Sequence, residues 1–139
     1  MTDQLETDVL RAGIALLQLD SALNLQEGKV TNLTPRPYVL VQTWTQWPED
    51  ADSNALDYLS RTLEARWYVH CVGDTRESAS AMAQRARTQL LDKLLTLTGR
   101  PTVAFTLIKQ ESALQPTLDE STGVPVFDAI SVYKTRVTI

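Results

Sequence analysis

Cysteine and histidine are almost absent from this chain of 139 residues, which contains one of each. A single Cys cannot form an intramolecular disulfide, so we expect the protein to function in a reducing compartment. A metal site based on His would need carboxylates for all of its other ligands. The two residues are neighbours, His70 and Cys71, so the scarcest reactive groups of the chain lie in one short segment.

The chain also lacks an excess of positive charge and any long hydrophobic run. Its 13 Lys and Arg stand against 17 Asp and Glu, which gives a net charge of −4 and argues against nucleic-acid binding as the main function. No apolar run approaches the length of a membrane span, and the acidic start MTDQLETDVL does not resemble a signal peptide. A hydrophobic content of 43% over this length predicts a single globular domain, residues 1–139.

Motifs typical of catalysis and cofactor binding are missing as well. The sequence contains no G-x-S-x-G, no G-x-x-x-x-G-K-[ST] and no G-x-G-x-x-G. Asp50 and Asp52 could hold Ca²⁺ weakly, but the segment EDADSN lacks the glycine and the distal glutamate of an EF-hand loop. We therefore expect neither an enzyme nor a bound metal or cofactor.

Hydrophobic periodicity predicts two amphipathic helices. The first covers residues 2–23, and the second begins with Asp74 or Thr75 as its cap and ends before Gly99. The expected buried stripes are Leu5, Val9, Ala12, Leu16 and Leu19 in the first helix, and Ala79, Met82, Ala83, Ala86, Leu90 and Leu94 in the second.

Alternating β-branched and aromatic residues predict four strands, over residues 38–46, 61–73, 101–114 and 129–139. The order of the elements is therefore helix, strand, strand, helix, strand, strand. This order predicts an α+β fold with a mainly antiparallel four-stranded sheet and two helices packed on one face. The more apolar face of the second strand is the expected core face, and it carries Leu63, Ala65, Trp67, Val69 and Cys71.

His70 and Cys71 are adjacent in the second predicted strand, so their side chains point to opposite faces of the sheet. They cannot form a nucleophile–base pair with each other. We interpret Cys71 as a small buried hydrophobic residue. His70 is interpreted as a half-exposed strand residue, with a role as a catalytic base as the alternative.

The acidic residues gather in two predicted loops that contain no Lys or Arg. Seven of the 17 acids lie there, and the segments are either ordinary solvated loops or a negative surface that repels or attracts a charged partner. These acids are Glu49, Asp50, Asp52, Asp57, Asp119, Glu120 and Asp128.

Trp44 and Trp47 lead into the first acidic loop. Aromatic residues near a strand end are often core residues, and they are also enriched in protein–protein interfaces. We favour the core for Trp44 and leave both interpretations open for Trp47.

The strand ARWYVHCVG, followed by the helix DTRESASAMAQRARTQLLDKL, resembles the tail terminator (tail completion) proteins of long-tailed bacteriophages. Members of that family carry an aromatic- and valine-bearing strand that ends in a break, then an Ala-rich helix with a small-residue stripe. Here the stripe is Ala79, Ala83, Arg87 and Leu90. The helical segment DVLRAGIALLQ and the final segment FDAISVYKTRVTI are similar to the remaining layout of the family.

The resemblance implies a structural virion protein, made in the host cytoplasm and located in the neck region of the tail. Six copies would form a ring that caps the tail tube, stops its polymerisation and offers a joining surface to the head connector. DNA would pass through the lumen without specific binding, and no catalytic residue or cofactor would be needed. Candidate lumen or rim positions are Glu49, Asp50, Asp52, Asp57, Asp119 and Glu120, and candidate interface positions are Trp47, Tyr133, Arg136 and Ile139.

Three alternatives remain open from the sequence. The chain could be another phage neck or tail-completion protein of similar fold. It could be a small intracellular enzyme that uses His70 as a base. It could also be a monomeric module that binds a basic partner through Trp47 and the first acidic loop.

Overall fold

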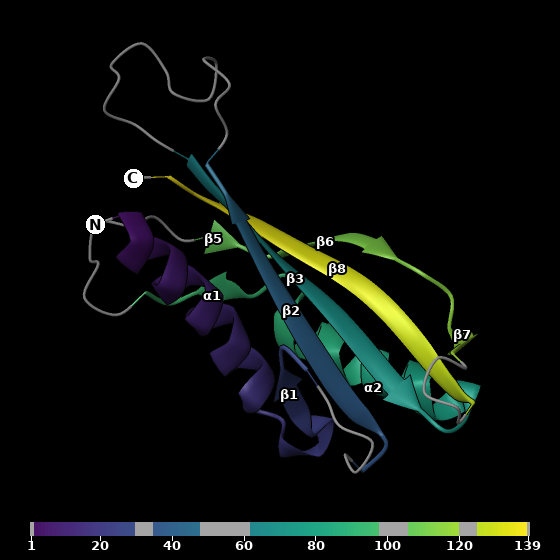
Figure 1. Ribbon diagram of the computed structural model, residues 1–139. Coiled ribbons are helices and arrows are strands. Elements are labelled where there is room, and N and C mark those ends of the chain that lie inside the picture. Colours follow the sequence, from purple (N-terminus) through teal and green to yellow (C-terminus); the bar gives the residue numbers. More distant parts are fainter. Residues whose placement is uncertain (1, 30–34, 48–61, 98–105, 120–124, 139) are drawn as a thin grey trace.

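The computed structural model describes residues 2–29, 35–47, 62–97, 106–119 and 125–138. Within these residues the chain forms two α-helices, one large sheet and a short two-stranded sheet (Figure 1). The helices are α1 (Thr2–Gln18) and α2 (Arg76–Leu90), and a 3₁₀ helix (Ser21–Leu23) follows α1.

The large sheet has the strand order β1-β2-β3-β8-β6, with β7 also paired to β8. Short β1 runs parallel to β2, whereas the other pairings within the described residues are antiparallel. β4 and β5 form the second, two-stranded sheet. The strands are β1 (Leu25–Glu27), β2 (Tyr38–Gln46), β3 (Thr62–Gly73), β4 (Leu94–Leu95), β5 (Thr106–Leu107), β6 (Lys109–Ala113), β7 (Thr117–Asp119) and β8 (Val126–Thr138).

This topology confirms an α+β fold with two helices and corrects the predicted sheet. The sheet is mixed and has more strands than the four expected. Leu25–Glu27 was not predicted as a strand because three residues are too short to show alternation. The described part of the predicted strand 101–114 is divided into β5 and β6 because the chain changes partner at Ile108, with β5 paired to β4 and β6 paired to β8.

Both helices end earlier than their periodicity predicted. α1 ends at Gln18, so Leu19 falls outside the helix and is 76% exposed. α2 ends at Leu90, since Asp92 adopts a left-handed conformation that turns the chain into β4 and leaves Leu94 exposed. The predicted start of α2 is confirmed, because the Thr75 side chain accepts a hydrogen bond from the Ser78 backbone N–H at 3.0 Å.

The core lies between the helices and one face of the sheet, which we call the inner face. The predicted core face of β3 is confirmed, since its five inner residues are completely buried. Trp67 and Tyr133 are cross-strand partners on β3 and β8, and both are buried. α1 packs beside Trp67, whose indole N–H donates to the Leu10 carbonyl oxygen at 3.3 Å. α2 packs over β3 and β8 through Ala79, Met82, Ala86 and Leu90.

Gly13 allows α1 to lie directly on Trp67. A Cβ atom at position 13 would fall within contact range of the indole ring, which is buried and held by its hydrogen bond to Leu10. We expect Gly13→Ala to lower the free energy of unfolding. Overpacking costs about 1–3 kcal/mol and exceeds the roughly 1 kcal/mol that alanine adds to helix propensity.

Urea unfolding followed by tryptophan fluorescence measures this change. Gln18→Ala, at an exposed position of the same helix, is the matched control. A Gly13→Ala protein as stable as the control would show that the helix does not depend on this close approach.

Candidate functional site

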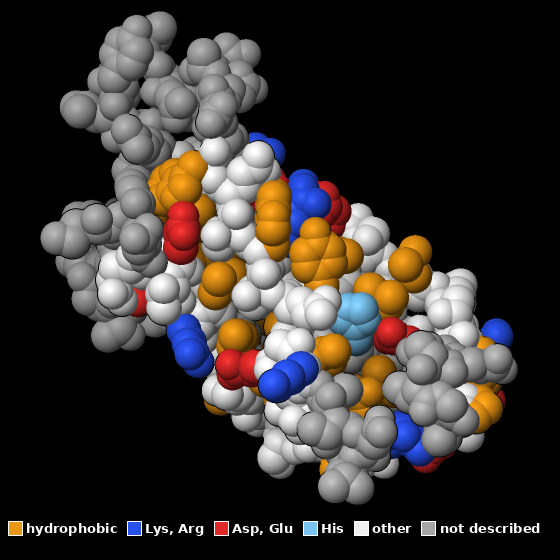
Figure 2. Space-filling model, in the orientation of Figure 1, with side chains coloured by type: hydrophobic (Ala, Val, Ile, Leu, Met, Phe, Trp, Pro, Cys, Tyr) orange, Lys and Arg blue, Asp and Glu red, His pale blue; other side chains and the backbone are white. Residues whose placement is uncertain are grey.

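We call the face of the sheet opposite the helices the outer face. It carries charged and polar side chains whose positions are set by the register of the strands. Outer-face residues of β2 and β3 alternate with the buried core residues, and Figure 2 shows charged and hydrophobic side chains interleaved on the visible surface. The register of β2, β3 and β8 places Trp44 beside Arg66 and Glu64 beside Arg136.

Glu64 is the centre of a charged cluster on the outer face, although it is only 6% exposed. It accepts hydrogen bonds from Arg66 at 3.0 and 3.2 Å and from Arg136 at 3.3 Å. Arg66 also pairs with Glu111 at 3.2 Å, and Glu111 pairs with Lys134 at 3.5 Å. These contacts connect β3, β8 and β6 across the outer face.

Burial is the largest influence on Glu64 and acts to raise its pKa. Hydrogen bonds and positive charge from Arg66, helped by Arg136 and Lys134, outweigh it and lower the pKa below its usual value. Glu64 is therefore a carboxylate at neutral pH. Its stabilising contribution is present at neutral pH and is lost when acid protonates it.

Trp44 lies on the outer face and is 37% exposed, which corrects its assignment to the core. Its ring stacks under the Arg66 guanidinium, with 4.9 Å from the guanidinium carbon to the ring centroid. The side chains of a strand alternate between its two faces, and β2 buries Val39 and Val41 on the inner face. Trp44 is three residues after Val41, so it lies on the outer face.

His70 and Cys71 point to opposite faces, as predicted. His70 is partly exposed, and its Nδ1 lies 3.1 Å from Asp128 Oδ2 on β8. Asp128 was predicted to lie in an acidic loop, but it belongs to β8. Cys71 is fully buried on the inner face. Burial, followed by the negative charge of Asp128, raises the pKa of the Cys71 thiol to about 12.

The candidate interface residues have different surroundings. Tyr133 is 1% exposed, so it belongs to the core and its assignment to an interface is corrected. β8 pairs with β3 on one side, and on the other side it pairs with β7 along Val126–Asp128 and with β6 along Ser131–Lys134. Arg136 is exposed, with a 63% accessible side chain. Trp47 packs against the core and donates its indole N–H to Glu6.

The candidate lumen residues Glu49, Asp50, Asp52, Asp57 and Glu120 lie outside the described residues, as does Ile139. Asp119 ends β7, which pairs with β8 at Val126.

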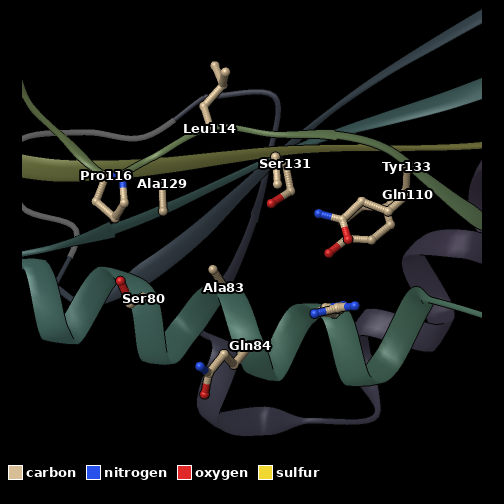
Figure 3. Close-up of a pocket in the computed structure, with 11 residues that line it drawn as sticks. Ser80, Ala83, Gln84, Gln110, Leu114, Pro116, Ala129, Ser131 and Tyr133 are labelled. Carbon is tan, nitrogen blue, oxygen red and sulfur yellow. The ribbon is translucent and has the colours of Figure 1, made fainter.

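A cleft of about 200 Å³ lies between α2 and the strands β6 and β8. Figure 3 shows Ser131 and Tyr133 pointing from β8 toward α2, with Ala83 facing them. Its lining includes the small residues Ala83, Ala129 and Ser131, which leave space between α2 and β8. It is smaller than a typical small-molecule site.

The described residues contain no group of three or more His, Cys, Asp or Glu placed to hold a metal ion. No helix in this part of the chain is long and apolar enough to span a membrane.

Sequence reasoning missed the carboxylate and cation cluster around Glu64. The alternation of Glu64 and Arg66 in one strand gave a local signal, since residues two apart share a face. The partners Glu111, Lys134 and Arg136 depend on strand order and register, which the local pattern does not contain.

The fold is thus an α+β domain with a mixed sheet and two helices on its inner face. The sequence matches no protein-family model and no curated protein. Comparison of the fold with solved structures does find similar proteins. A chain from the virion of a native gene transfer agent (GTA) particle aligns over 93% of both chains, with a TM-score of 0.63 and 14% identity. The bacteriophage SPP1 gp17 protein aligns over 98% of this chain and 91% of its own, with a TM-score of 0.50 and 18% identity. This chain therefore shares its fold with bacteriophage and virion proteins.

The raised pKa of Cys71 predicts an unreactive thiol. At pH 8 the folded thiol stays protonated and inaccessible, so a thiol reagent should label the native protein far more slowly than the protein unfolded in guanidinium. Above the ordinary value of 9.0 only the unfolded thiol ionises, so the contribution of this group to stability falls between pH 9.0 and about 12.

Labelling followed by absorbance measures this directly, because Cys71 is the only cysteine. Labelling of the native protein at the rate of the unfolded one would contradict the assignment of Cys71 to the core.

Proposed function

We propose that this chain is a structural protein of a phage-type virion, a tail terminator that acts in the neck region of the tail. Six copies form a ring that caps the tail tube, stops its polymerisation and provides the surface that joins the head connector. The protein is not an enzyme and needs no cofactor. DNA passes through the lumen of the ring without specific binding.

The observation that carries this proposal is the fold shared with the gene transfer agent virion chain over 93% of both chains. A similarity over this share of both chains concerns the whole domain and not one common motif. It agrees with the resemblance of residues 65–94 to tail terminators, which was based on the sequence alone. Two members of the stripe in that resemblance, Ala79 and Leu90, are buried, whereas Arg87 is exposed.

The physical logic of termination favours a protein with two different faces. A tube subunit needs complementary top and bottom surfaces to form an open stack, whereas a terminator needs only one surface that matches the tube. Each subunit of the ring also needs two different lateral surfaces, one for each neighbour. Trp47 and exposed Arg136 remain candidates for these surfaces.

The two acidic segments are proposed to face the lumen or its rim. Their carboxylates would repel the phosphates of the passing DNA and keep it from adhering. This role concerns Glu49, Asp50, Asp52, Asp57, Asp119 and Glu120.

Another neck or tail-completion protein of similar fold is the nearest alternative, and the SPP1 gp17 likeness is compatible with it because a fold alone does not distinguish positions in a virion.

An enzyme using His70 is a further alternative. The His70–Asp128 pair is the observation that favours it, since a carboxylate beside His can orient a catalytic imidazole. A binding module that uses Trp47 is the third alternative.

Electron microscopy of purified protein mixed with tail tubes tests the main proposal. We expect rings with a central hole, either free or at one end of each tube, and tubes whose growth stops when the ring is bound. His70→Ala should cap tubes as well as the wild type. A protein that leaves tube ends bare and tube length unchanged is not a terminator.

Neutralising the acidic segments tests the proposed lumen. A variant with Asp50, Asp52 and Asp119 changed to Asn and Glu120 changed to Gln should still form rings but slow DNA ejection, because DNA then adheres to the lumen. Ejection kinetics measured by DNA-dye fluorescence report the effect. Normal kinetics with rings of normal shape would argue against a lumenal position.

A further inference from the structure

A basic hollow of about 310 Å³ lies on the sheet where β5, β6 and β8 meet. Its charged lining residues are Lys109, Lys134 and Arg136, and the other described lining residues are Leu107 and Thr135. Three cations thus converge on a surface depression within a chain whose net charge is −4.

The carboxylates of the described residues balance the cations of the hollow only in part, since Arg136 pairs with Glu64 at 3.3 Å and shares it with Arg66. Lys109 and Lys134 are direct cross-strand partners, and like charges opposite each other destabilise a sheet. Glu111 neutralises Lys134 only in part, because it is shared with Arg66. Lys109 makes no ion pair with any carboxylate in the described part of the chain. An anionic partner would relieve this repulsion.

The surroundings of the hollow favour carboxylates on a protein over phosphates on DNA. Leu107 is 40% exposed at the hollow, and exposed Trp44 lies nearby under Arg66. Arg, Trp and exposed apolar groups together are typical of protein interfaces. Glu64 and Glu111 are interleaved with the cations, and their negative charges would repel a nucleic-acid backbone.

The start of α1 supplies the complementary charge on a second copy. Its sequence has acids at positions 3, 6 and 8, and the first base is Arg11. Glu6 accepts a hydrogen bond from Trp47, which follows β2, so this acidic turn lies near the end of β2.

The acidic turn and the basic hollow lie at the same end of the sheet but toward different edges. Gln46 of β2 pairs with Glu64 of β3, which in turn pairs with Arg136 of β8. β2 and β6 are separated by β3 and β8 (Figure 1). The subunits of a ring are related by rotation about the ring axis, so a given residue lies at the same height along that axis in every subunit. The acidic edge of one subunit can therefore meet the basic edge of its neighbour.

We propose that the hollow formed by Lys109, Lys134 and Arg136 binds the acidic start of α1 of a neighbouring copy and is a lateral contact of the ring. This inference rests on the proposed function, because it assigns a contact within the ring. It makes the contact heterologous, with each copy giving its α1 to one neighbour and its hollow to the other.

Charge reversal tests the contact in a mutant cycle. Lys109→Glu and Asp8→Lys should each weaken ring formation at low salt by at least about tenfold, since like charges then face each other. The protein with both changes should recover most of the loss, because the reversed charges attract again. Lys93→Glu, at an exposed position outside the hollow, is the matched control.

Ring formation is measured by the protein concentration needed to assemble, using light scattering for free rings or microscopy of capped tubes. Circular dichroism of each variant confirms that it is folded.

Single variants that assemble like Lys93→Glu overturn the inference but leave the ring proposal intact. The inference is also overturned if Lys109→Glu weakens ring formation but Asp8→Lys alone does not weaken it and the double variant does not restore it. Loss of duplex-DNA binding without loss of assembly would instead assign the hollow to phosphates. A wild type that forms no ring, free or on tubes, overturns the proposed function itself.

Discussion

The packing of Trp67 against α1 is the contact on which the rest of the fold depends. Trp67 lies in β3, the strand that joins the β2 side of the sheet to the β8 side. Its buried ring lies against Gly13, and its N–H donates to the backbone of α1, so one side chain fixes the distance and position of the helix. Because α1 also contacts α2, this placement limits the space for the second helix. The inner-face residues of β3 are consequently apolar and completely buried.

The outer face has a different character, and the proposed functions depend on it. Its polar groups are arranged by strand register, as the Glu64 cluster shows, and most of its charges are held in pairs. Such a surface is suited to recognition by shape and charge.

The sequence predicted what depends on local pattern and failed where distant segments meet. The bounds of β2, the core face of β3 and the cap of α2 follow from alternation and capping chemistry within a few residues. The parallel pairing of β1 and the interior position of β8 depend on strand order, which no local pattern contains. Tyr133 was misplaced because β8 mixes Ser131 and Thr135 into its inner face and Val132 into its outer face, which blurs the alternation. For the candidate site, Arg136 was proposed from the sequence, but its neighbours Lys109 and Lys134 could be placed beside it only from the register of β6 and β8.

The long pairing of β3 with β8 also sets the order in which the chain can fold. β2 and β3 are neighbours in sequence, whereas β3 and β8 enclose α2 and all the strands from β4 to β7. Bringing such distant segments together costs loop-closure entropy before their contacts repay it, and folds rich in these contacts are slow to form. The β2–β3 pair is therefore expected to form early, with closure by β8 as the rate-limiting step. Until that step is complete, one edge of β3 is unpaired, and chaperones that shield exposed strands have their best opportunity to act.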